Sequence, residues 1–239
     1  MTWSIVAHDP ESGAFAVAIA TCAFAVGAHC PYVRSGVGAV ATQSITNRYL
    51  GPAILDLIEG GVAPAQAIER ALAADEGRQL RQVHAVDRLG RTAAWTGRHC
   101  VEWCGDRTAA HISVAGNMLA GEAVLTHSFE AMRSRGDLAL PERLLAAMQE
   151  GERQGGDRRG KQSAALLLTT SEDFADLNIR VDDHADPLLE LSRLLAIWRQ
   201  QWPGRAAWAP SKANPSGCTD LNVIEAAWKA QGLDLRFRR

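Results

Sequence analysis

The chain has 239 residues, enough to bury a full hydrophobic core as one large domain or as one domain with an appendage. Its hydrophobic fraction of 47% and charged fraction of 22% are ordinary for a globular protein, and a net charge of −2 with both signs interspersed argues against nucleic acid or an anionic membrane as the main partner. No apolar run approaches the roughly 20 residues that span a bilayer, and the N-terminus lacks the basic and apolar regions of a signal peptide. We therefore expect a cytoplasmic protein with no membrane partner.

The chain opens with a pattern typical of a buried β-hairpin. Thr2–Asp9 is apolar and β-branched and predicts a strand, and Asp9–Gly13 supplies turn residues. Ala14–Thr21 is almost wholly apolar and predicts the second strand. A small-residue segment, Cys22–Cys30, follows and is expected to form a packed loop beside the sheet.

The next segments alternate between pairs of helices and groups of strands. A strand over Ala39–Gln43 ends in a dense polar set that includes Gln43, Asn47 and Arg48, which are candidates for substrate contact or for a surface turn that caps the next helix. The helix candidates are Gly51–Glu59, a helix that opens at Pro64, Gly121–Arg133 and Pro141–Arg153. The later strand candidates are Gln79–Val86, Arg91–Thr96, Val101–Cys104, His111–Val114, Ser163–Thr169 and Leu177–Asp182.

This order of elements predicts the fold class. Two stacked antiparallel sheets with a helical pair on each outer face would form a four-layer αββα sandwich, an α/β (α+β) fold. A doubly wound parallel sheet would need single strands and helices in alternation, which the chain does not offer. We expect this domain to cover residues 1–202, with its last helix capped by Asp186-Pro187, and a Pro/Gly/Ser-rich linker to open a short appendage over residues 203–239.

The cysteines fit a reducing compartment. Five is an odd number, and their spacing shows no regular disulfide framework. His99-Cys100 and Cys104 could contribute to a metal site, but no second pair accompanies them, so buried free thiols are the preferred interpretation. We expect no cofactor.

Thr2 is the candidate catalytic residue. Methionine before a small residue is commonly removed after synthesis, which would give Thr2 a hydroxyl and a free α-amine of pKa about 7.7–8.0 at the start of a central strand. A hydroxyl beside its own general base is an activated nucleophile. The alternative is that Thr2 is simply the first residue of a strand.

Several motifs together resemble the bacterial domain-of-unknown-function family 1028, which is assigned to the N-terminal nucleophile (Ntn) hydrolase superfamily. The matching segments run in the family's order across roughly residues 2–200: Thr2-Trp-Ser-Ile-Val-Ala-His-Asp-Pro10, Phe24-Ala-Val-Gly-Ala28, Gly36-Val-Gly-Ala-Val-Ala-Thr-Gln43, Gly116-Asn-Met-Leu-Ala-Gly121, Gly155-Gly-Asp-Arg-Arg-Gly160 with Gln162-Ser-Ala-Ala165, and Arg180-Val-Asp-Asp-His184. The resemblance implies an αββα fold and a superfamily that mostly cleaves amide bonds.

The N-terminal hairpin also resembles that of a proteasome-type β subunit, with two departures. Ala20-Thr21 stands where an Asp-Ser pair is expected, and Arg34 is the cation nearest to the expected lysine position. Arginine does not readily release a proton, so Arg34 could lower the pKa of the amine but could not relay a proton. A proteasome-like peptidase is therefore disfavoured.

The other candidate site residues follow from this mechanism. The Gly116 N–H and the Asn117 side chain could form an oxyanion hole, with a helix-capping turn as the alternative. Asp157 could orient the new α-ammonium, and Arg158 and Arg159 could bind a substrate carboxylate. The pocket would be lined by Gln43, Asn47, Arg48 and Gln162.

The sequence predicts a small amide or peptide-like substrate and a homo-oligomer, and it leaves two alternative functions open. One is a catalytically inactive Ntn fold that binds a small acidic or amide ligand or acts in an assembly. The other is metal-assisted hydrolysis by Asp182, Asp183 and His184, with His127 or His111 as a further ligand, although adjacent strand residues point to opposite faces.

Overall fold

The computed structural model describes residues 2–230 and residue 232. The chain divides into two compact units, one that runs to Ser192 and one that begins at Arg193. The candidate site residues all lie in the first unit, which contains both sheets. The second unit holds the end of helix α5 (Pro187–Ala206) and helix α6 (Leu221–Ala230).

The larger sheet is built around the N-terminal hairpin. Its strand order is β10-β9-β2-β1-β8-β7, and all neighbours are antiparallel. The strands are β1 (Thr2–Asp9), β2 (Ala14–Thr21), β7 (Gly105–Ala109), β8 (Ile112–Asn117), β9 (Ser163–Thr169) and β10 (Leu177–Val181). The two predicted hairpin strands are therefore confirmed, and they occupy the middle of the sheet.

The smaller sheet has the order β3-β4-β5-β6, again with antiparallel neighbours. Its strands are β3 (Pro31–Arg34), β4 (Gly38–Ser44), β5 (Arg81–Asp87) and β6 (Thr92–Thr96). It packs on the larger sheet through small and β-branched side chains, among them Val6 and Val17 on one side and Ala39, Ala41 and Val86 on the other. Such residues let two sheets approach closely.

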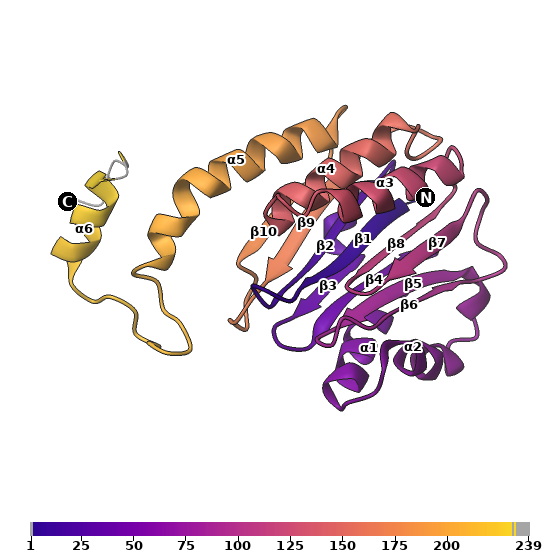
Figure 1. Cartoon of the computed structure of the whole chain (residues 1–239), viewed down its shortest axis with the longest axis horizontal. Helices are drawn as coiled ribbons and strands as arrows, with labels where there is room; N and C mark the ends of the chain where they lie inside the picture. Colours follow the sequence, from indigo (N-terminus) through magenta and orange to yellow (C-terminus); the bar gives the residue numbers. More distant parts are fainter. Residues whose placement is uncertain (1, 231, 233–239) are drawn as a thin grey trace. The chain divides into compact units, whose positions relative to one another are not determined.

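Two helical pairs complete the sandwich. Helices α1 (Leu50–Glu59) and α2 (Pro64–Ala73) cover the smaller sheet, and helices α3 (Glu122–Ser134) and α4 (Leu140–Arg153) cover the larger one (Figure 1). Pro64 stands at the first turn of α2, where its missing N–H costs no hydrogen bond. The predicted four-layer αββα sandwich of two antiparallel sheets is confirmed.

Several predicted elements differ from the observed ones. Val101–Cys104 is not a strand: its Val101 and Trp103 carbonyls accept hydrogen bonds from Met118 and Leu119, just after β8. Gln79 and Leu80 belong to a short 3₁₀ helix, η2 (Arg78–Leu80), so β5 begins at Arg81.

A further difference concerns the last long helix. The Asp186 carboxylate accepts the Leu189 N–H at 3.2 Å, which confirms the predicted cap. Leu188 and Leu191 are buried. Helix α5 then continues through Pro203 to Ala206, so the expected linker begins later than predicted.

A search of the described residues finds no helix with the length and hydropathy needed to cross a membrane.

Candidate active site at the start of the first strand

The start of β1 meets the ends of β2 and β8 at one edge of the layer between the sheets. Thr2 pairs with Asn117 of β8, and Thr21 is the last residue of β2. The Thr2 hydroxyl donates to the Thr21 hydroxyl at 3.3 Å, and Thr2 is only 6% exposed. Since directly paired residues share a face, the Thr2 and Asn117 side chains both point toward the smaller sheet.

A cavity of about 240 Å³ opens at Thr2. Two loops form most of its wall, the segment between β2 and β3 and the segment after β4. Its lining residues are Thr2, Thr21, Ala23, Phe24, Val26, His29, Cys30, Ser44, Thr46 and Arg48. A residue with a potential nucleophile therefore contacts a small, mainly uncharged chamber.

Buried contacts hold the loop between β2 and β3 over the start of β1. Val26 of the 3₁₀ helix η1 (Val26–Ala28) and Cys30 pack on Ile19 and Ala165 in one apolar cluster. A Cβ on Gly27 would lie 2.5 Å from the Ala165 side chain, so only glycine allows this approach. The loop wall is thus fixed by contacts with β2 and β9.

The ionisable side chains of the cavity are a cation, a histidine and a thiol. Arg48 Nη2 donates to the Ala28 carbonyl at 3.2 Å. Burial raises the pKa of the Cys30 thiol to about 11, so Cys30 is a neutral thiol at neutral pH rather than a nucleophilic thiolate. Burial likewise raises the pKa of the Tyr32 hydroxyl, which lies near Arg48.

The backbone at this cavity adopts an uncommon conformation. Ser44 lines the cavity with φ 72°, and Ala25, one residue after Phe24, has φ 54°. A non-glycine residue in the left-handed region costs about 1–2 kcal/mol, and such residues concentrate at functional sites. The observation supports a function for this end of the sandwich.

Behind Thr2, buried polar side chains link the two sheets. Ser4 Oγ donates to Gln43 Oε1 at 2.7 Å, and Gln43 Nε2 donates to Gln82 Oε1 at 2.9 Å and to the Ala115 carbonyl at 3.2 Å. Asn117 Nδ2 donates to Gln82 Oε1 at 2.9 Å. Gln82 Nε2 donates to the Gly116 carbonyl at 2.8 Å. We call these residues, together with His84 and Ser113, the intersheet network.

His84 lies at the far end of the intersheet network. Its Nε2 is 2.7 Å from Ser4 Oγ and its Nδ1 is 2.9 Å from Ser113 Oγ. Because the Ser4 hydrogen is directed to Gln43, a neutral imidazole donates from Nε2 and accepts at Nδ1. Burial lowers the pKa of His84 to about 3, so this neutral form holds at neutral pH.

The structure brings Gln43, Asn117 and Gly116 together near Thr2, with different roles. The Gln43 side chain is fully buried in the intersheet network and lies 3.5 Å from the Thr2 carbonyl, so it supports the site from behind. Gly116 lies inside β8 with a partner strand on each side, and a Cβ there would meet Leu119 at 2.6 Å and Trp3 at 3.0 Å. Gly116 is a packing residue and does not line the cavity, contrary to its predicted role as an oxyanion donor.

Asn47 and Arg48 also have different roles. Asn47 Nδ2 donates to Asp75 at 2.9 Å and its Oδ1 accepts the Tyr49 N–H at 3.1 Å. The hydrogen bond from Arg81 to Asp75 is the main cause that lowers the pKa of this carboxyl to about 2. Asn47 therefore shapes the loop before α1, and Arg48 is the residue of this pair that reaches the cavity.

The segment over residues 155–162 lies against the end of β2. Asp157 accepts the Cys22 N–H at 2.8 Å and the Arg159 N–H at 2.9 Å. The Gln162 N–H bonds the Thr21 carbonyl at 2.9 Å, while its side chain donates to Asp183. Arg158 is exposed. Asp157 and Gln162 thus hold this segment against the end of β2.

Arg34 lies at the opposite end of the smaller sheet. It pairs with Gly38 at the start of β4, whereas Gln43 near the end of β4 contacts Thr2. Gly38 and Gln43 are about 17 Å apart along β4 for a strand rise of roughly 3.3 Å per residue. Its guanidinium binds Asp56 at 2.8 Å and Glu59 at 2.6 Å. The prediction that Arg34 borders the Thr2 amine is wrong.

The predicted metal ligands are directed to separate partners. Asp182 pairs with Arg180 at 2.7 Å, Asp183 accepts from Gln162, and His184 Nδ1 accepts the Asp186 N–H at 2.9 Å. In the part of the chain that the structure describes, no three His, Cys, Asp or Glu side chains gather as a metal site would require. These contacts contradict the metal alternative.

The sequence interpretation missed part of the cavity wall. Phe24, His29 and Cys30 line it and are not among the predicted site residues, whereas Ser44 and Thr46 belong to the predicted polar set at the end of β4. The sequence signal was the small-residue loop itself, which was expected to be packed. Its partner surface on β9 is remote in sequence and could not be inferred from local pattern.

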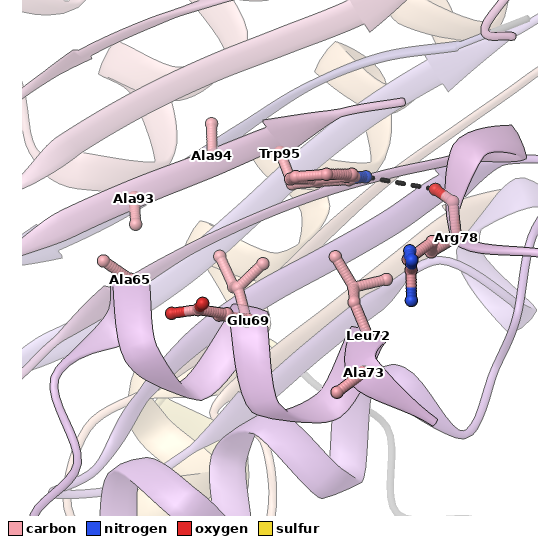
Figure 2. Close-up of a pocket in the computed structure, with 9 residues that line it drawn as sticks. Ala65, Glu69, Leu72, Ala73, Arg78, Ala93, Ala94 and Trp95 are labelled. Carbon is pink, nitrogen blue, oxygen red and sulfur yellow. Dashed lines mark hydrogen bonds between the residues drawn. The ribbon is translucent and has the colours of Figure 1, made fainter. Parts of the chain in front are cut away.

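A second, larger cavity of about 480 Å³ lies between α2 and the edge strand β6. Figure 2 shows the Trp95 indole of β6 directed at the Arg78 carbonyl, which accepts its N–H at 3.1 Å. Most of its lining is alanine, leucine and isoleucine, with Glu69 and Arg78 as the charged residues. Its lining contains no Ser, Thr or Cys nucleophile, in contrast to the cavity at Thr2.

Fold and site together define a four-layer αββα protein whose first strand begins at a small cavity. The chain belongs to the family of unknown function DUF1028, whose model matches residues 2–191. Among solved structures it is similar to protein SPO2555 from Silicibacter pomeroyi, a DUF1028 protein, at 32% sequence identity and a TM-score of 0.85. That match covers 92% of this chain and 96% of the other.

A second solved structure is much more distant. Anbu (ancestral beta-subunit) from Yersinia bercovieri matches at 11% identity and a TM-score of 0.38, over 87% of this chain and 98% of that one. A search of curated proteins finds no match.

Proposed function

We propose that the protein is an amidohydrolase of the N-terminal nucleophile type, with Thr2 as nucleophile once Met1 has been removed. The observation that carries the proposal is the position of Thr2, at the start of a central strand and in the wall of a cavity. The substrate is a small amide or a peptide-like molecule.

The reaction needs one residue for both attack and proton transfer. The α-amine of Thr2, directly or through one water, takes the hydroxyl proton while Oγ1 attacks the amide carbon. The proton then passes to the leaving nitrogen, the C–N bond breaks, and an acyl ester on Thr2 remains. Water, deprotonated by the same amine, hydrolyses this ester and restores the hydroxyl.

The negative oxygen of each tetrahedral intermediate needs a hydrogen-bond donor. Asn117 is the candidate because it pairs with Thr2, and only one of its two Nδ2 hydrogens is needed for the bond to Gln82. Removal of one such donor typically slows the reaction 10²–10³-fold. Gln82 would hold the Asn117 amide in place.

Positioning roles follow for two other predicted residues. Gln43 is 3.5 Å from the Thr2 carbonyl and would fix the backbone of the nucleophile. Asp157 holds the Cys22 amide, next to Thr21, and would keep the end of β2 in register. Arg158 and Gln162 stay predictions for substrate contact.

The test begins with the intact mass of the chain expressed without an N-terminal tag. A mass lower by one methionine is expected, followed by turnover in a screen of small amides. Thr2→Ala should abolish turnover and Thr2→Ser should keep part of it, while Thr126→Ala on α3 should have no effect.

Two results would contradict the proposal. Retention of Met1 removes the α-amine from Thr2, and turnover that survives in Thr2→Ala excludes this nucleophile. A processed chain that binds amides without cleaving them would instead support the inactive binding protein left open by the sequence.

A further inference from the structure

We propose that the molecule bound at Thr2 is a small amide that also carries a carboxylate and an apolar side group. Arg48 binds the carboxylate, and Phe24 contacts the apolar group. This assignment rests on the proposed function, because it takes the Thr2 cavity as the substrate site.

The charge of the cavity is the first argument for an anionic ligand. Arg48 is the one charged side chain among the ten described lining residues that keeps its charge at every physiological pH, and none of the ten is Asp or Glu. A cavity with a guanidinium and no acid favours an anion.

The acids of the flanking segments are already neutralised by other arginines. Asp75 pairs with Arg81 at 2.9 Å, Asp157 with Arg159 at 3.2 Å, and Asp182 with Arg180 at 2.7 Å. These pairs leave Arg48 as the guanidinium directed to the cavity rather than to a neighbouring carboxylate.

The geometry of Arg48 suits a carboxylate. Its Nη2 is held by the Ala28 carbonyl at 3.2 Å, which anchors the side chain across the cavity wall. Arg48 also hydrogen-bonds the Tyr32 side chain. A guanidinium has five N–H donors in a plane, so donors remain for the two oxygens of a carboxylate. Lysine would supply the charge without this paired geometry.

The wall of the cavity includes one exposed aromatic side chain. Phe24 lines the cavity and is 66% exposed. A ligand that covers this side chain gains hydrophobic free energy. An aromatic or branched side group would cover Phe24.

The volume limits the size of the ligand. About 240 Å³ is below the 300–1,000 Å³ that is typical for drug-sized ligands. An acylated amino acid has the required amide, carboxylate and side group within this size, whereas a longer peptide would extend beyond the cavity.

Binding to the full-length Thr2→Ala variant tests the assignment without turnover. The probes are N-acetyl-L-phenylalanine and its neutral C-terminal amide, which differ in shape by little and in charge by one. Calorimetric titration should give a Kd at least about 10-fold lower for the carboxylate, since charge-assisted paired bonds are the strong ones.

Two further variants test which arginine recognises the carboxylate of the ligand. Arg48→Gln in the same background should bring the two Kd values within about 2-fold of each other. Arg98→Gln removes an exposed arginine that is not part of the cavity wall and has no predicted role in the site, and it should keep the preference for the carboxylate.

The proposal is overturned if both probes bind equally, if neither binds, or if the carboxylate preference survives in Arg48→Gln. These outcomes are separate from failure of the proposed hydrolysis. Retention of Met1 or absence of turnover would contradict the proposed hydrolase. The ligand assignment would still hold if the protein prefers the carboxylate and loses this preference in Arg48→Gln.

Discussion

At the scale of single residues, His84 is the buried base of the intersheet network. It is fully buried between the sheets, and both ring nitrogens contact serine hydroxyls. Protonation would place a charge in this layer and replace an acceptor at Nδ1 by a donor. The folded state therefore selects the neutral form.

This selection makes the stability depend on pH. The folded pKa of His84 is about 3, below the usual 6.5, so the unfolded chain binds more protons between these values. Stability is complete above about pH 6.5 and falls as the pH drops toward 3. The pKa of His8 is also lowered, mainly by burial and then by His111, so His8 changes the stability in the same direction.

Urea unfolding at pH 7, 6 and 5 measures the effect. The free energy of unfolding should fall by up to about 1.4 kcal/mol per pH unit from His84 below pH 6.5. His84→Gln should lose this part of the slope, whereas His127→Gln on the exposed side of α3 should keep it. Equal slopes in all three proteins would show that His84 does not titrate on unfolding.

Gln82 is the residue on which most of the intersheet network depends. Gln82→Ala would remove the partner of Asn117 Nδ2, one of the two acceptors of Gln43 Nε2, and the side-chain donor to the Gly116 carbonyl. An unsatisfied buried group costs about 1–3 kcal/mol, so a loss of at least about 1 kcal/mol in unfolding free energy is expected.

Gln66→Ala is the matched control for Gln82. Gln66 lies exposed on α2, and its replacement should change stability by less than about 0.5 kcal/mol. Comparable stability of the two variants in denaturant titrations would show that the intersheet network contributes little.

The site residues were predictable to different degrees. Thr2 and Asn117 follow from the hairpin register and from polar residues at strand ends, and the structure does pair them. Arg34 was misplaced because the sequence does not reveal that β3 is short and that Arg34 stands at its far end. The loop wall of the cavity depends on the contact of Gly27 with Ala165, which no local pattern encodes.

At the scale of elements, the strands whose bounds were predicted to the residue are β1, β2 and β9. Each is an apolar run between turn residues, and each is central or nearly central in its sheet. The edge strand β7 was missed because its sequence, Gly-Asp-Arg-Thr-Ala, is polar and its side chains are partly exposed. Polar residues protect sheet edges, and they remove the apolar signal that a pattern search needs.

The contact between α3, α4 and β1 depends on a small residue. A Cβ on Gly151 of α4 would lie 2.4 Å from Ser128 Oγ of α3 and 3.0 Å from the Trp3 indole nitrogen. Gly151→Ala gains up to about 1 kcal/mol in helix propensity but forces the buried helices apart.

We expect Gly151→Ala to lose about 1–3 kcal/mol in unfolding free energy despite its better helix propensity. Gly136→Ala, at a position where a Cβ meets no atom within 4 Å, serves as control and should be nearly neutral. A Gly151→Ala protein as stable as the parent in thermal and urea unfolding would mean that the helices repack without cost.

At the scale of the whole molecule, the sequence predicts a domain over residues 1–202. A chain that ends at residue 202 keeps the buried Leu188 and Leu191 of α5, so its melting temperature should stay within a few degrees of the full chain. A chain that ends at residue 184 loses both side chains, at about 1.5–3 kcal/mol each.

Calorimetry of the full chain and of the chains that end at residues 202 and 184 checks this order of melting temperatures. A chain of residues 1–202 that melts as low as the shorter chain would place part of the core beyond residue 202. The predicted homo-oligomer is checked on the same samples by light scattering.

The pairing of β1 with later strands determines how long the N-terminus stays accessible during synthesis. Thr2 is enclosed only when Asn117 of β8 stands beside it, and β2 gains its second neighbour only when β9, which ends at Thr169, has emerged. At a synthesis rate of roughly 5–20 residues per second, the ribosome needs roughly 8–34 s to reach Thr169. A methionine aminopeptidase at the ribosome therefore has many seconds to act on the N-terminus before Thr2 is paired with Asn117.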